Sequence, residues 1–77
     1  MILFTKPGCE KCDYVKKLIP ERMAVKTYDV TEVDGLAELA YLELVSLAEK
    51  EMPILVLRDG GHVAGALPIK QALKNYC

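Results

Sequence analysis

The chain is organised around one short stretch, Lys6-Pro7-Gly8-Cys9-Glu10-Lys11-Cys12. It follows directly on an apolar run, Met1 to Phe4, and the residues after it have the pattern of a helix. Residues i and i+3 in a first helical turn lie on one face, and their separation suits a disulfide. Unpaired N–H groups and the helix dipole favour negative charge on the first cysteine, which stabilises its reactive thiolate form. The stretch therefore predicts two thiols placed to open and close a disulfide.

The composition indicates one small domain, residues 1–77. The apolar fraction of 52% is enough for a compact core. A formal net charge of −1 argues against a nucleic-acid or membrane-surface role, because both usually need a basic excess. No stretch approaches the roughly 20 uncharged apolar residues of a membrane span. The first residues also lack the charged region and apolar core of a signal peptide.

The chain has three cysteines, which is an odd number and too few for a disulfide scaffold. Without a secretory signal, this count indicates a reducing compartment and a catalytic use of the close pair. We therefore expect a cytoplasmic protein. The third cysteine, Cys77, is interpreted as an incidental terminal thiol, with intermolecular pairing as the alternative.

Hydrophobic periodicity predicts seven elements in the order strand, helix, strand, helix, strand, strand, helix. The expected strands cover residues 2–5, 24–30, 54–57 and 62–64. The expected helices cover residues 10–19, residues 34–45 or 34–48, and a last segment that begins at Pro68 and whose apolar stripe is Ile69, Ala72, Leu73 and Tyr76. The first three elements suggest a parallel βαβ unit, and the last three a hairpin followed by a helix. The fold class is therefore α/β, a four-stranded mixed sheet with helices on both faces.

The second expected helix carries two further signals. Thr31 and Asp34 fit a capping box at its start. Its apolar positions are broader than one buried face needs: a stripe of Leu36, Ala40, Leu44 and Leu47, widened by Leu39, Leu42 and Val45. Either the helix packs deeply on the sheet, or part of it is a partner or dimer surface.

Two segments carry a resemblance to a known family. Phe4-Thr5-Lys6-Pro7-Gly8-Cys9-X-X-Cys12 closely resembles the active-site segment of glutaredoxins and of small glutaredoxin-like thioredoxins, and Met52-Pro53 before an apolar strand resembles their cis-proline segment. The element order is that of the minimal thioredoxin fold, β-α-β-α-β-β-α with three helices. The resemblance covers essentially all 77 residues. It implies an enzyme, a thiol–disulfide oxidoreductase that carries electrons to protein disulfides.

The resemblance also implies roles for single residues. Cys9 would be the nucleophile and Cys12 the resolving cysteine. Pro53 would be cis and face the disulfide, and Met52 would offer backbone groups to an extended substrate segment. Lys6, three residues before Cys9, either favours the thiolate electrostatically or is a solvated loop charge.

The corner before the last helix departs from the family pattern. Glutaredoxins that use glutathione carry a Thr-Val-Pro segment and a Gly-Gly corner followed by acidic residues. Here the proline follows Glu51-Met52, and the corner reads Gly65-Ala66-Leu67-Pro68. We therefore expect a carrier that is not strictly glutathione-dependent. Its reductant would be a thioredoxin-reductase-like flavoenzyme or a low-molecular-weight thiol such as glutathione. Gly65 of the corner is also expected to bind substrate, together with Lys6, Met52 and Pro53.

Neither a metal nor a bound cofactor is expected. A closed zinc site needs four ligands, and beyond Cys9 and Cys12 the chain offers only His62, Cys77 and carboxylates. His62 is interpreted as an exposed turn residue. We expect a monomer whose partners are protein disulfides and an external reductant, with no nucleic acid and no membrane. The alternatives are a metal or iron–sulfur carrier on a glutaredoxin-like fold, and a non-catalytic interaction module.

Overall fold

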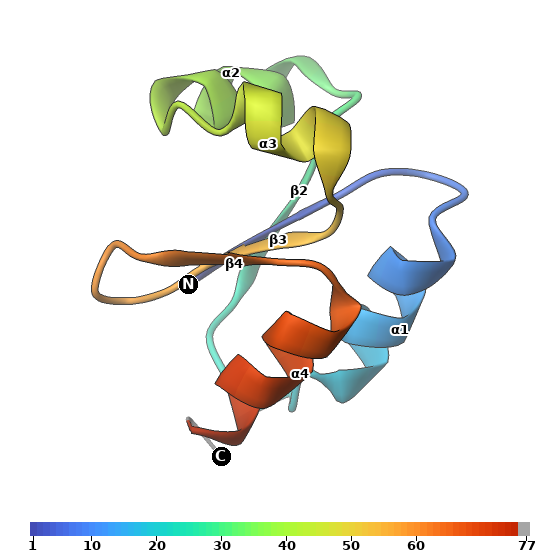
Figure 1. The fold of residues 1–77 in the computed structure, drawn as a ribbon, viewed down its shortest axis with the longest axis vertical. Coiled ribbons are helices and arrows are strands. Elements are labelled where there is room, and N and C mark those ends of the chain that lie inside the picture. The colour runs from blue at the N-terminus through green and yellow to red at the C-terminus, as the bar shows by residue number, and fades with distance from the viewer. Residues whose placement is uncertain (76–77) are drawn as a thin grey trace.

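A four-stranded mixed sheet lies at the centre of the computed structural model, which describes residues 1–75 (Figure 1). The strands are β1 (Ile2–Thr5), β2 (Lys26–Asp29), β3 (Ile54–Val56) and β4 (His62–Ala64). The helices of this part are α1 (Glu10–Leu18), α2 (Val33–Tyr41), α3 (Val45–Lys50) and α4 (Ala66–Lys74). The expected α/β class and the four expected strands are confirmed. Tyr76 and Cys77 lie outside the described residues.

The strand order is β2-β1-β3-β4. β1 runs parallel to β2 and antiparallel to β3, so Leu3 lies between Thr27 on one side and Leu55 on the other. β3 and β4 form the antiparallel hairpin that Asp59-Gly60-Gly61 predicts. Because β1 and β3 are central and covered on both faces, β3 is a continuous apolar run, and β1 is apolar up to the buried Thr5 at its end.

Helices cover both faces of the sheet, α1 and α4 on one and α2 and α3 on the other (Figure 1). Successive side chains of a strand point to opposite faces of the sheet. Neighbouring residues of β1 therefore pack in two different hydrophobic clusters, one on each face. Leu3 packs in a cluster with Val15, Met23, Leu55, Ile69 and Leu73. Phe4 packs in the other cluster, with Cys12, Leu39, Leu44, Met52, Ile54 and Val56.

The expected second helix is not continuous. α2 ends at Tyr41, and α3 begins at Val45 after Glu43, whose φ of 59° breaks the helix. The turn between the two helices lets both Leu39 and Leu44 enter the core. One straight helix would not bury so wide an apolar set on a single face. The described residues therefore contain four helices where three were expected.

The expected stripe of that helix is also wrong in part. Gly35 and Leu39 form the buried side of α2, whereas Leu36 and Ala40 are exposed. Only Leu44 of the expected stripe is buried, at the start of α3. The outward apolar residues of α2 are left without a covering element in the part of the chain that is described.

The expected capping box before α2 does not form. The helix begins after Glu32, which makes no side-chain cap. Thr31 instead donates its backbone N–H and its hydroxyl to Asp29 Oδ1, at 2.8 and 2.6 Å. These two hydrogen bonds hold the pKa of Asp29 below its usual value. A carboxylate two residues before the threonine competes for the groups that a capping box requires.

The remaining boundaries differ from expectation by a few residues. β2 is shorter than residues 24–30, and α1 ends at Leu18 rather than at residue 19. The last helix begins at Ala66, so Pro68 stands at its third position. Gly65 precedes that helix with a φ of 93°, a backbone conformation that glycine adopts without strain.

Candidate functional site

Cys9 stands at the N-cap of α1, directly after the turn through Pro7 and Gly8 that follows β1. Gly8 has a φ of 69°, which lets the chain reverse there. The Cys9 side chain is half-buried, and its Sγ accepts the backbone N–H of Cys12 at 3.1 Å. The expected placement of the pair at the start of a helix is confirmed.

Cys12 is fully buried and packs in the cluster that contains Phe4 and Met52. Burial raises the pKa of its thiol from 9.0 to about 11, and a hydrogen bond between this thiol and the Cys9 side chain acts in the same direction. A backbone hydrogen bond from Lys6 and the charge of Lys16 oppose this rise. The two thiols therefore differ: one is accessible at a helix start, and the other is held protonated at neutral pH.

The segment Met52-Pro53 reaches the same region from the beginning of β3. Its peptide bond is cis, as the resemblance implied. Met52 is buried in the cluster of Cys12, and Cys9 packs against that cluster. Pro53 is fully buried, and its carbonyl oxygen accepts the N–H of Gly65 at 2.9 Å. This bond ties the corner before α4 to the proline.

An open groove of about 310 Å³ joins three of these segments. Its lining residues are Lys11, Glu51, Ala64, Gly65, Ala66, Leu67 and Pro68. Lys11 comes from between the two cysteines, and Glu51 comes from just before Met52-Pro53. Leu67 leaves 71% of its surface exposed, which gives the groove an apolar border. The groove has the apolar wall and the few charged groups that suit an extended peptide segment.

Not every residue expected at the site places its side chain near the thiols. The Lys6 side chain is exposed, and the contact of Lys6 with the thiols is the backbone hydrogen bond to Cys12. The sequence did not point to Lys11 or Leu67 as groove residues. Lys11 had a usable signal, because any residue between the cysteines of such a motif lies beside them. Leu67 also had a signal, because it stands two residues after Gly65 in the corner that was expected to bind substrate.

Residues 1–75 hold no group of three or more His, Cys, Asp or Glu side chains that could bind a metal ion. His62 is exposed at the start of β4. Among the helices of the same residues, none has the length and apolar character needed to cross a membrane.

The difference between the two thiols predicts selective alkylation. Iodoacetamide added to the folded protein at about pH 8 should label Cys9 well before Cys12, because only the thiolate reacts. With its pKa at about 11, Cys12 is ionised in roughly one molecule in a thousand at that pH. Its labelling should rise as the pH approaches 11, since deprotonation then becomes appreciable. Peptide mapping by mass spectrometry measures both rates, and guanidinium-unfolded protein is the control in which they should converge. Equal rates in the folded protein would contradict this difference.

Comparison with models of known protein families finds no match, and comparison with curated proteins finds none either. The chemistry of Cys9 and Cys12 therefore carries the proposed function.

Proposed function

We propose that the protein is a small dithiol oxidoreductase that reduces protein disulfides through Cys9 and Cys12. One observation carries the proposal. An accessible cysteine at a helix start accepts, on its sulfur, the N–H of a fully buried cysteine three residues later. This arrangement suits a nucleophile and a resolving thiol, because one sulfur meets the substrate and the other is shielded from it.

The reaction is a pair of thiol–disulfide exchanges. Cys9 loses its proton to solvent, and its thiolate attacks one sulfur of a substrate disulfide; the substrate S–S bond breaks, and the departing sulfur takes a proton from solvent. Cys12 then gives up its proton and attacks Cys9 Sγ, which releases the second substrate thiol. Two electrons and two protons pass to the substrate, and a Cys9–Cys12 disulfide remains. The raised pKa of Cys12 keeps it protonated at neutral pH in the dithiol form, which supports Cys9 as the sulfur that attacks first.

The fold assignment is part of the proposal. We assign the chain to the minimal thioredoxin fold, with the second helix of that fold divided into α2 and α3. The strand order β2-β1-β3-β4 and the thiols at the start of α1 support the assignment. The protein would act as a cytoplasmic monomer, since reducing compartments are where a dithiol carrier operates.

Substrate would lie in the groove that Lys11, from between the two cysteines, lines together with Glu51 and Gly65. Met52 would supply backbone groups, and Gly65 would let the substrate chain approach the corner closely. The charges at the groove, Lys11 and Glu51, are of opposite sign, so they select neither acidic nor basic segments. The corner Gly65-Ala66-Leu67-Pro68 itself has no acidic side chain, unlike the corner of glutaredoxins that use glutathione, and this difference supports another electron donor. The carboxylate at the groove is that of Glu51, which comes from the segment before Met52-Pro53.

Insulin reduction tests the proposal and its donor separately. The full chain is given insulin and either NADPH with thioredoxin reductase or NADPH with glutathione and glutathione reductase. Turnover with the first system is the expected result. Turnover only with glutathione would contradict the proposed donor and leave the thiol chemistry standing. Failure with both systems, and with dithiothreitol as a direct reductant, would contradict the function itself.

A further inference from the structure

The outward side of α2 is apolar and uncovered. Val33, Leu36 and Tyr41 expose 82%, 51% and 81% of their surfaces. With two exposed alanines they form what we call the α2 outer face: Val33, Leu36, Ala37, Ala40 and Tyr41. Positions i, i+3, i+4, i+7 and i+8 share one side of a helix, here the side opposite the buried Gly35 and Leu39. A contiguous exposed apolar surface of this kind marks an interaction site.

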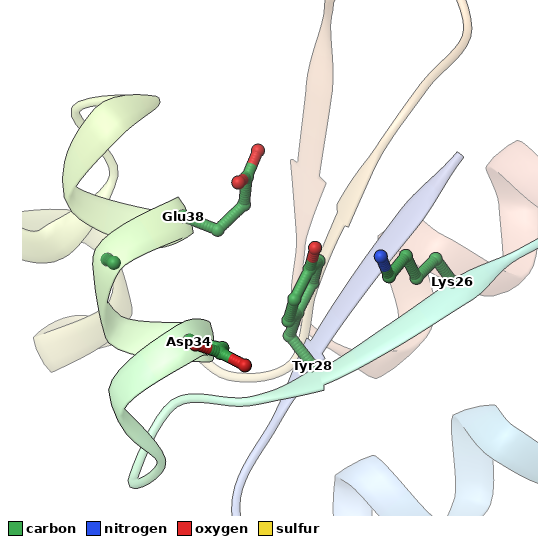
Figure 2. A pocket seen from close by; sticks show the side chains of 5 residues that line it. Lys26, Tyr28, Asp34 and Glu38 are labelled. Carbon is green, nitrogen blue, oxygen red and sulfur yellow. The ribbon is translucent and has the colours of Figure 1, made fainter.

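A hollow of about 390 Å³ lies beside this face, between α2 and the edge strand β2. It is lined by Lys26, Tyr28, Asp34, Ala37 and Glu38. Figure 2 shows Asp34 and Glu38 projecting from α2 towards Tyr28 and Lys26 of β2. Ala37 belongs both to the hollow and to the α2 outer face, so the two are continuous.

The aromatic wall of the hollow is fixed in place. The Tyr28 ring stacks on the buried Phe4 ring, with centroids 5.9 Å apart. Lys26 Nζ lies 5.0 Å from the centre of the Tyr28 ring, a cation–π distance. A hydrogen bond with Tyr28 raises the pKa of Lys26, and the carboxylates of Glu38 and Asp34 add to the rise. The ammonium group of Lys26 is thus stabilised in the hollow, beside the packed ring of Tyr28.

The charge of this region is negative. Inside the hollow, two carboxylates face a single ammonium group, which leaves one negative charge uncompensated. Residues 27–49 contain no lysine or arginine, and their acidic residues are Asp29, Glu32, Asp34, Glu38, Glu43 and Glu49. The α2 outer face is therefore an apolar surface within acidic surroundings.

We propose that the α2 outer face and the adjoining hollow bind a partner protein segment whose apolar side chains are flanked by arginine or lysine. The apolar side chains would cover Val33, Leu36 and Tyr41. A guanidinium or ammonium group would enter the hollow between Asp34 and Glu38, where it gains charge-assisted hydrogen bonds. The site lies across the sheet from α1, so it does not depend on the thiol chemistry (Figure 1).

The acidic charge around the α2 outer face indicates which kind of partner can bind there. Two copies of this chain joined face to face would bring acidic groups against acidic groups, which disfavours a dimer through α2. Anionic membrane surfaces and nucleic acids are repelled for the same reason, since both recruit basic patches. A basic, amphipathic protein segment can cover the apolar residues of the α2 outer face and also pair with the acidic residues of the hollow.

Two synthetic amphipathic peptides test the proposal. Both carry the same leucine stripe, flanked by arginines in one peptide and by glutamates in the other. Each is titrated into the full-length ¹⁵N-labelled protein. The arginine peptide should shift the amide signals of residues 26–28 and 33–41, and high salt should weaken its binding. Tyr41→Ser, and separately Asp34→Asn with Glu38→Gln, should each raise its Kd roughly tenfold.

The matched control removes the same charge elsewhere, as Asp13→Asn with Glu21→Gln, and should leave the Kd unchanged. Circular dichroism checks that each variant is folded. Equal binding of the glutamate peptide, equal binding by the face variants, or a Kd weaker than about 1 mM for the arginine peptide would overturn the proposal. A dimer in sedimentation that Tyr41→Ser abolishes would overturn it too, in favour of a second copy of the chain.

Discussion

Replacing Cys9 with serine should abolish disulfide reduction, lowering the rate of insulin reduction by a factor on the order of 10³ or more. The Cys9 sulfur is the accessible one, whereas Cys12 is fully buried and its raised pKa keeps it protonated. A serine hydroxyl is a far weaker nucleophile at neutral pH and forms no stable bond to sulfur. The measurement is the initial rate of insulin precipitation with dithiothreitol, corrected for the rate without protein.

Cys12→Ser and Cys77→Ser are the matched variants. Cys12→Ser should lose turnover but keep the first step, so a mixed disulfide between Cys9 and the substrate should accumulate and appear by mass spectrometry. Cys77→Ser should keep the parent rate. Full activity of the Cys9→Ser variant would show that the reaction does not pass through this sulfur.

Gly35→Ala should cost about 3 kcal/mol of unfolding free energy, a large share of the roughly 5–15 kcal/mol of a typical domain. A Cβ at Gly35 would overlap the carbonyl oxygen of Asp29 and lie 2.6 Å from its carbonyl carbon. Because these are backbone atoms at the end of β2, α2 must move away from the sheet to make room. This cost exceeds the ~1 kcal/mol that alanine gains over glycine within a helix.

Urea unfolding followed by circular dichroism measures the effect. Gly61→Ala is the matched control, since the nearest obstacle to its Cβ is the Asp59 side-chain oxygen at 3.1 Å. This oxygen accepts the Gly61 N–H, and a small shift of the flexible side chain makes room for the Cβ. The control should lose much less stability than Gly35→Ala. A Gly35→Ala protein as stable as the parent would show that α2 does not sit as closely on β2 as described.

The elements that the sequence predicts well are those defined by local patterns. The apolar runs around Leu3 and Leu55 identify strands covered on both faces, and Asp59-Gly60-Gly61 identifies the hairpin. The break between α2 and α3 escapes prediction because it occurs at Glu43, a residue that rarely adopts a positive φ. Its cause is tertiary, since Leu39 and Leu44 must both reach the core.

The capping box failed for a local reason. Thr31 has the spacing to Asp34 that a capping box needs. However, its backbone N–H and its hydroxyl both donate to the carboxylate of Asp29 instead. Gly35 was a missed signal of another kind. A glycine inside a helical pattern often marks a close backbone approach, here to Asp29.

The candidate site also has one part that local sequence patterns predict and one part that they do not. The placement of Cys9 and Cys12 at a helix start follows from their spacing, which is local. The burial of Cys12 and the hydrogen bond between Pro53 and Gly65 join segments distant in sequence, so no local pattern encodes them. These long-range contacts distinguish the two thiols and form the groove.

The most direct test is to count thiols in the full chain across a series of dithiothreitol redox buffers. Samples are quenched with acid, alkylated after unfolding, and analysed by intact mass and peptide mapping. The proposed function predicts that oxidation removes two alkylation sites together, that the linked peptides contain Cys9 and Cys12, and that reduction restores both sites. If all three cysteines are still alkylated after oxidation, or if the linkage joins other cysteines, the proposed dithiol chemistry is wrong.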